Sequence, residues 1–294
     1  MLWSMVRPGA GALYALLAVT FSVIWAASIV AVKTLVTYAP PLLAITIRFL
    51  VAGGLLLVLA RLRGLPFPAT LAAWRPLVVL GLLTNALYLG LSAIALTDLS
   101  SGTVAILAST NPLILAVVAP WLLAEPLTRG KALGLLVGFA GVVWVMHVRV
   151  GADDRPWAMA VTVLAIGFLV AGNILFKRMR FAHHLLVVNA GQLLAAGLAL
   201  VLPALLLEPL GAIRWTPPFV AAMAFVVVAA SCVGTLLWYW LLRNGDASRA
   251  SAYFFLNPVL GVFLGGLLLG EPLRAADFAG AAVVGLGIYL VQRG

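Results

Sequence analysis

Apolar runs of about 20 residues recur along the chain, with short polar connections between them. An α-helix of about that length crosses the roughly 30 Å hydrocarbon core of a bilayer. The pattern predicts an all-α integral membrane protein with ten transmembrane helices, at residues 11–32, 41–60, 76–96, 103–123, 130–148, 157–176, 185–207, 218–242, 250–269 and 275–292. The connections are too short to fold as separate soluble domains, so we expect function to lie between the helices.

The first apolar run follows Arg7 and contains small residues, as a secretory signal peptide also does. Its length exceeds the usual apolar core of a signal peptide. The internal repeat described below also requires this helix, so we interpret it as the first span.

Composition excludes a water-soluble globule, because 65% of the residues are hydrophobic and only 9% are charged. The net charge of +10 is an orientation signal in such a chain rather than evidence for nucleic acid binding. Twelve basic residues fall on the side shared by both termini, against five on the other. These are Arg7, Arg61, Arg63, Arg75, Arg129, Lys131, Lys177, Arg178, Arg180, Arg243, Arg249 and Arg293, against Lys33, Arg149, Arg155, Arg214 and Arg274. We therefore expect a protein of the cell inner (plasma) membrane with both termini cytoplasmic.

The chain contains an internal repeat. The stretch STNPLILAVVAPWLLAEPL at 109–127 matches FLNPVLGVFLGGLLLGEPL at 255–273 without a gap, and residues 25–33 parallel residues 169–177. These matches predict two domains, 1–150 and 151–294, each of five helices. Five is odd, so the second repeat crosses the membrane in the inverted sense, around a central cavity. Inverted repeats are the plan of secondary transporters that work by alternating access.

Each repeat carries an Asn-Pro pair inside an apolar run: Asn111 and Pro112 in the first, Asn257 and Pro258 in the second. Proline lacks the N–H that would bond the carbonyl four residues earlier, and a bilayer tolerates such a break only where protein or water satisfies it. One reading is a kink that serves packing alone. Because the placement is symmetric, the other reading is a hinge or gating element.

The paired Asn-Pro stretches, together with IRFLVAGG at 47–54 and VIWAASIVAVK at 23–33, resemble the EamA-type members of the drug/metabolite transporter superfamily. The resemblance covers nearly the whole chain and implies a ten-helix carrier for small metabolites. Within that superfamily the chain is similar to aromatic amino-acid exporters of the YddG type, partly through Trp25 and Trp238. This implies export of amino acids, including aromatic ones; export of cationic drugs or other metabolites is the alternative.

Polar and aromatic side chains within the spans are the candidates for the cavity, since lipid-facing positions need neither. They are Trp25 and Ser28 in the first span, Asn85 and Tyr88 in the third, Asn173 in the sixth, Asn189 and Gln192 in the seventh, Trp238 and Tyr239 in the eighth, and Tyr253 and Phe255 in the ninth. Aromatic faces would stack on a flat or cationic substrate, and amides would bind its polar ends. Trp121, Trp144 and Trp157 lie near span ends, and we interpret them as the interfacial belt.

Arg48 is a charged side chain well inside a span, where facing lipid would cost at least about 2.5 kcal/mol. We expect it to face the interior. It could attract a substrate carboxylate, or it could serve structure by binding backbone carbonyls. Its repeat partner Gln192 is uncharged, which favours the structural role.

A membrane-embedded enzyme and a passive scaffold are the competing classes. All eight acids map to loops or span ends, the three histidines lack ligand companions, and the single Cys232 lacks an adjacent base. We therefore expect no enzyme, no metal and no cofactor, with the bilayer and a small molecule as partners and a monomer as a plausible state. The absence of an acid within the spans also predicts that substrate flows down its own gradient, unless Glu125 or Glu271 folds inward.

Overall fold

The computed structural model describes residues 10–147, 154–179, 181, 183–269 and 274–294, all helical or connecting segments without a β-strand. The Glu271-Pro272 pair of the second repeat and Asp153 lie outside the described residues. Among those described, nine helical stretches are long and apolar enough to cross a membrane. With the divided ninth span, the arrangement is that of a membrane protein of about ten helices, as the sequence predicted.

The first repeat runs through five spans. They are α1 (Ala10–Tyr38), α2 (Pro41–Leu62), the third span formed by α3 (Leu71–Gly81), η1 (Leu82–Leu87) and α4 (Tyr88–Ala95), the fourth formed by α5 (Ser101–Ala108) and α6 (Asn111–Leu123), and α7 (Arg129–Met146). Several spans begin with a proline in the first turn or a Ser or Thr cap, as at Pro41, Thr70, Ser100 and Thr128.

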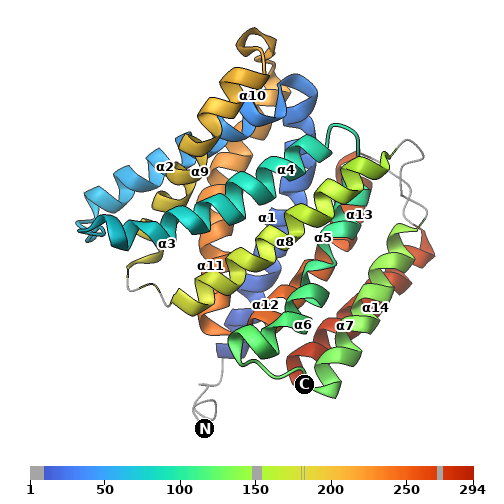
Figure 1. The fold of residues 1–294 in the computed structure, drawn as a ribbon. Coiled ribbons are helices and arrows are strands. Elements are labelled where there is room, and N and C mark those ends of the chain that lie inside the picture. Colours follow the sequence, from blue (N-terminus) through green and yellow to red (C-terminus); the bar gives the residue numbers. More distant parts are fainter. Residues whose placement is uncertain (1–9, 148–153, 180, 182, 270–273) are drawn as a thin grey trace.

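The second repeat has the same series. It consists of α8 (Pro156–Met179), α9 (Leu185–Leu207), a short turn η2 (Leu210–Ala212), the eighth span formed by α10 (Pro217–Phe225), η3 (Val226–Gly234) and α11 (Thr235–Asn244), the ninth formed by α12 (Ala247–Ser251), η4 (Ala252–Phe255) and α13 (Leu256–Leu269), and α14 (Ala275–Arg293). Helix α1 starts and α14 ends at the lower end of Figure 1, which we call the termini end. The end where α1 passes into α2 is the opposite end.

Equivalent helices of the two repeats pack against each other. Helix α2 lies along α9 and α7 along α14, as Figure 1 shows for the second pair at the lower right. A Cβ on Gly134 would come within 2.7 Å of the Gly287 carbonyl oxygen, and one on Gly287 within 2.4 Å of the Gly138 backbone. Glycine is therefore required where these backbones touch.

The third and eighth spans contain π-helical segments, η1 and η3, that the sequence analysis did not anticipate. They occupy equivalent places in the two repeats, since Leu82 and Val226 are 144 residues apart. A π-turn disturbs the α-helical ladder, and side chains bind the carbonyls here: Thr84 Oγ1 donates to the Leu80 oxygen at 2.7 Å and Asn189 Nδ2 to the Ser231 oxygen at 2.9 Å. Such segments occur frequently at functional sites.

Both Asn-Pro pairs lie where a helix restarts. Helix α6 begins at Asn111 after a turn, and α13 begins one residue before Asn257, after the 3₁₀ segment η4. Each proline thus falls in a first helical turn, where its missing N–H has no intrahelical partner to lose. The fourth and ninth spans are broken at equivalent depths.

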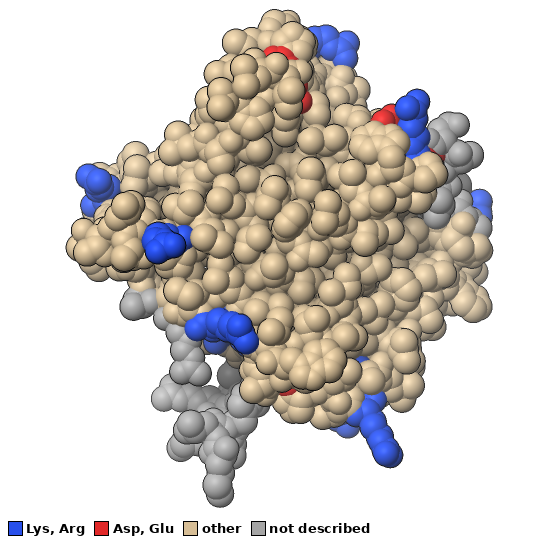
Figure 2. All heavy atoms as spheres, in the orientation of Figure 1, with Lys and Arg blue, Asp and Glu red and all other residues tan. Residues whose placement is uncertain are grey.

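Charged side chains gather at the two ends of the bundle. In Figure 2 one group lies along the left and bottom of the view, and a second group lies along the top and right. An uncharged band separates the two groups. Large exposed hydrophobic residues such as Leu16, Leu136 and Leu198 belong to the spans and suit contact with lipid acyl chains.

Candidate functional site

A buried polar network connects the two π-helical segments. Gln192 lies at its centre, and its Oε1 accepts hydrogen bonds from Tyr239 Oη at 2.5 Å, Thr84 Oγ1 at 3.1 Å and Asn85 Nδ2 at 3.2 Å. Gln192 Nε2 donates to Asn189 Oδ1 at 2.8 Å. Three spans, the third, seventh and eighth, therefore contribute to one network inside the bundle.

Arg48 extends this network from α2. Its Nε donates to Ser231 Oγ at 2.8 Å, and its guanidinium lies 5.5 Å from the centre of the Phe49 ring. The residue is only 2% exposed. Among the described residues, no carboxylate forms an ion pair with it. A buried cation without a carboxylate is costly, so a negative group from elsewhere would be favoured here.

A small cavity adjoins Arg48. Its lining includes Trp25, Ser28, Arg48, Tyr88 and Ser92, with aliphatic residues around them. The volume of about 40 Å³ holds no more than a few water molecules. Four predicted site residues thus meet at one cavity, which must widen to hold a metabolite.

An aromatic cluster lies beside the cavity. The Trp25, Trp238 and Phe254 rings surround Phe21, with Phe21 stacked on Trp238 at 5.0 Å between ring centres. Trp238 Nε1 donates to Asn173 Oδ1 at 3.0 Å, which joins two further predicted residues. Phe21 and Phe254 were missed, because apolar residues in a span do not reveal which way they face.

Other predicted residues lie outside the cavity lining. The Tyr253 carbonyl accepts from Ser22 Oγ at 3.1 Å, and Phe255 packs against Gly138, where a Cβ would come within 2.6 Å of its ring. Asn111 and Asn257 are fully buried, with amide groups that have no hydrogen-bond partner in the described part of the chain. A hinge or gating role for the Asn-Pro pairs stays a prediction.

A wide vestibule opens at the termini end, with a volume of about 870 Å³. It lies between the ends of α6, α8 and α11, and its lining combines aromatic and charged side chains: Trp121, Glu125, Phe176, Lys177, Arg178, Phe181, Arg243 and Asp246. The lining residue Phe176 stacks on Tyr239 with ring centres 4.3 Å apart and planes at 12°. One aromatic layer therefore separates the vestibule from the Gln192 network.

The sequence held a signal for one residue that was not among the candidates: Phe176 directly precedes Lys177, the repeat partner of Lys33. No three His, Cys, Asp or Glu side chains of the described residues are grouped so that they could hold a metal ion.

Two repeats of broken spans around a buried polar site define the class: a multi-pass membrane transporter. The chain belongs to the EamA-like transporter family, which matches residues 12–147 and again residues 156–293. Its relatives are transporters and not enzymes.

Two relatives match almost end to end. The uncharacterized transporter YvbV of Bacillus subtilis is 30% identical over 95% of this chain and 90% of its own length. The uncharacterized inner membrane transporter YedA of Escherichia coli is 27% identical over 97% of this chain and 90% of its own length. A crystal structure with 20% identity has the same fold, with a TM-score of 0.78 over 95% of this chain and 97% of that one.

Proposed function

We propose that the protein exports amino acids, including aromatic ones, by alternating access around the Arg48 cavity. The observation that carries the proposal is the buried Arg48 guanidinium, which has no carboxylate partner among the described residues and lines a cavity with Trp25 and Tyr88. Arginine binds carboxylates with paired charged hydrogen bonds. Aromatic faces beside it suit a flat side chain.

The test is counterflow in proteoliposomes with matched substrates that differ only in the carboxylate. Tryptophan should be exchanged, and tryptamine should be rejected by a factor of about 10² or more, because its binding would leave the Arg48 guanidinium unpaired. Arg48→Gln should abolish this discrimination. The control is Arg63→Gln, at the exposed end of the same helix, which should leave it unchanged.

The alternative, export of cationic drugs, makes the reverse prediction. An aromatic cluster of Phe21, Trp25, Trp238 and Phe254 can also bind an organic cation. Faster exchange of tryptamine than of tryptophan, with a gain in Arg48→Gln, would favour the drug exporter and reject the amino-acid proposal.

We also propose that the protein lies in the inner membrane with the termini end facing the cytoplasm, as the distribution of Lys and Arg indicates. Ala69 lies in the loop after α2 at the termini end, and Gly211 lies in the loop after α9 at the opposite end. In a Cys232→Ser background, an impermeant maleimide should label Gly211→Cys in intact cells and Ala69→Cys only after the membrane is opened. Reversed labelling would reject the orientation.

For energy coupling we propose flow down the substrate gradient. The described acids lie at the two ends of the bundle and are held there by partners such as Lys177, Lys131 and Arg155. Uptake into proteoliposomes at clamped membrane potential should be the same with and without an imposed pH gradient. Accumulation above equilibrium in response to that gradient would show proton coupling instead.

A further inference from the structure

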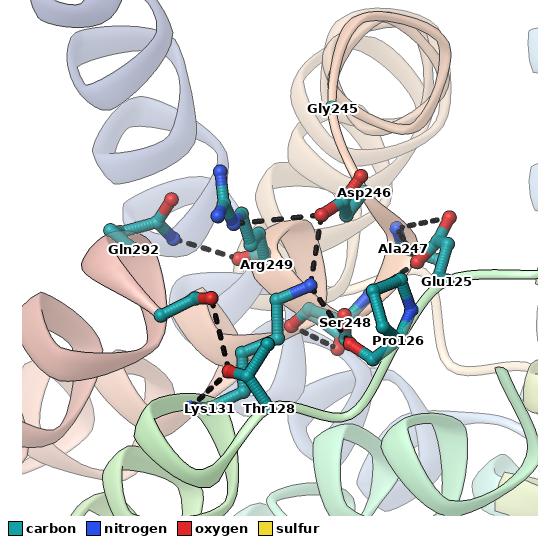
Figure 3. A network of polar contacts seen from close by, with 12 residues as sticks. Glu125, Pro126, Thr128, Lys131, Gly245, Asp246, Ala247, Ser248, Arg249 and Gln292 are labelled. Carbon is teal, nitrogen blue, oxygen red and sulfur yellow. Dashed lines mark hydrogen bonds and ion pairs between the residues drawn. The ribbon is translucent and has the colours of Figure 1, made fainter. Parts of the chain in front are cut away.

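The Glu125 carboxylate joins three parts of the chain at the termini end, and Figure 3 shows its contact with Ala247. It forms an ion pair with Lys177 Nζ of α8 at 2.7 Å. It also accepts from the Ala247 amide at 2.8 and 3.0 Å and from the Ser248 amide at 3.4 Å, at the start of α12. Glu125 follows α6 and is only 8% exposed. The fourth, sixth and ninth spans are thereby tied to one side chain.

A second set of charges holds the same turn. Lys131 of α7 is 2% exposed, pairs with Asp246 at 3.0 Å and donates to the Pro126 carbonyl at 3.2 Å, as Figure 3 shows. Arg249 lies 3.5 Å from the same Asp246 carboxylate. Helix α12 therefore cannot move away from α6 and α7 without breaking buried charged contacts.

The same lysine sits next to the aromatic layer between the vestibule and the network. Lys177 Nζ also donates to the Gly245 carbonyl at 2.7 Å, at the end of α11. The preceding residue, Phe176, stacks on Tyr239 of α11, whose hydroxyl donates to Gln192. Any separation of α8 from α11 at this end would break both the hydrogen bond from Lys177 to Gly245 and the ring stack.

We infer that the Glu125 and Lys177 pair is a latch, and that it holds the gate formed by Phe176 and Tyr239 closed between the vestibule and the Arg48 cavity. Lys177 acts on the gate through the backbone that it shares with Phe176, and Glu125 acts through its ion pair with Lys177. Both are therefore positioning residues that do not touch the substrate. The inference rests on the proposed function in that the Arg48 cavity is the transport site. Its test uses no substrate, so the two can fail separately.

The experiment measures how fast the interior is reached from the termini end. Ser28 lines the cavity and is 6% exposed, and within the described part of the chain its hydroxyl bonds only the Trp25 carbonyl of its own helix. Ser28→Cys in a Cys232→Ser background gives one interior thiol. Membrane vesicles with the termini end outward are treated with an impermeant maleimide, and the labelling rate is recorded.

Glu125→Gln should raise that rate by about tenfold, because it removes the charge on which the closed state depends. Lys177→Gln should do the same. The double variant should add little beyond either single change, because both remove one interaction. Vesicles of opposite orientation should show no increase, which excludes general loosening of the fold.

The matched control is Glu208→Gln. Glu208 accepts from the Leu42 and Leu43 amides at 2.9 and 2.7 Å, so it also binds the first turn of a helix, but at the opposite end. The Glu208→Gln variant should leave the labelling rate of the Ser28→Cys thiol from the termini end unchanged. The latch is rejected if both Glu125→Gln and Lys177→Gln label at the parent rate while eluting as folded protein. It is equally rejected if Glu208→Gln raises the rate as much.

Discussion

Lys33 and Lys177 occupy equivalent positions in the two repeats, at opposite ends of the molecule. Lys33 Nζ donates to the Leu99 carbonyl at 2.8 Å, and Lys177 Nζ donates to the equivalent carbonyl of Gly245 at 2.7 Å. The other partners among the described residues differ: Lys33 also donates to the Leu96 carbonyl at 2.5 Å, whereas Lys177 pairs with the Glu125 carboxylate. Glu271, the repeat equivalent of Glu125, lies outside the described residues, so the comparison covers one common bond and the partners that the structure describes.

The residues that precede the two lysines differ as well. Val32 lines the cavity of about 40 Å³, and Phe176 lines the vestibule of about 870 Å³. The opposite end is closed by further hydrogen bonds, such as Asp154 Oδ1 accepting from the Ser100 amide at 2.6 Å and Arg214 donating to the Thr37 carbonyl at 2.7 Å. The described contacts at the two ends therefore differ, although the two repeats share one plan. The vestibule opens toward the termini end, and the layer formed by Phe176 and Tyr239 separates it from the Gln192 network.

The largest effect is expected where the two ends differ most in side-chain size. Phe176→Ala should lower the free energy of unfolding by about 3–5 kcal/mol, because it removes a buried ring that stacks on Tyr239. Val32→Ala, its equivalent, should cost only about 2 kcal/mol, since it removes two methyl groups. Unfolding by SDS in mixed micelles measures both. Equal losses would show that the Phe176 layer contributes nothing beyond ordinary packing.

The next effect concerns the charge. Lys177→Met should cost about 2–3 kcal/mol, because it leaves the nearly buried Glu125 carboxylate without a counter-charge. Lys33→Met should cost about 1 kcal/mol, since the partners that it leaves among the described residues are neutral carbonyls. The same SDS titration measures the loss of unfolding free energy for both variants. Salt at 1 M should reduce the difference between the two losses, because it screens the ion pair of Lys177 with Glu125. A larger loss for Lys33→Met than for Lys177→Met would contradict the assignment of the ion pair to the termini end.

The smallest effect is expected in the network. Tyr239→Phe should cost about 1 kcal/mol or less, because Gln192 Oε1 keeps its bonds from Thr84 and Asn85 and the ring still stacks on Phe176. Labelling of the Ser28→Cys thiol should stay within about twofold of the parent rate. A rise as large as that of Glu125→Gln would place the latch on the hydroxyl and not on the ion pair.

Much of the fold was readable from the sequence. The length of the apolar runs predicted the spans, and the shift between the Asn-Pro stretches predicted two repeats of one family, which the family match confirms. The π-helical segments were not readable, because the residue types in Leu82–Leu87 and Val226–Gly234 fit a regular α-helical span equally well. Lipid replaces water around the bundle, so an apolar side chain is equally acceptable inside and outside.

The candidate site was readable in type but not in arrangement. Arg48, Gln192 and Trp25 were identified because polar or aromatic groups in a span need a reason to be there. Phe255 was selected by the same rule, yet it packs on Gly138 outside the cavity lining. Residue type alone does not give the direction of a side chain, which depends on the rotation of each helix.

The sequence by itself determined that the chain crosses the membrane as helices, that it does so twice over in inverted units, and where each unit breaks. It determined these because hydrocarbon requires every backbone group to be bonded within a span and because proline cannot donate. Only the tertiary structure decided which end carries the vestibule, that Glu125 meets Lys177, and that Lys33 meets the Leu96 and Leu99 carbonyls. These contacts join residues far apart in the chain, so no local pattern in the sequence predicts them.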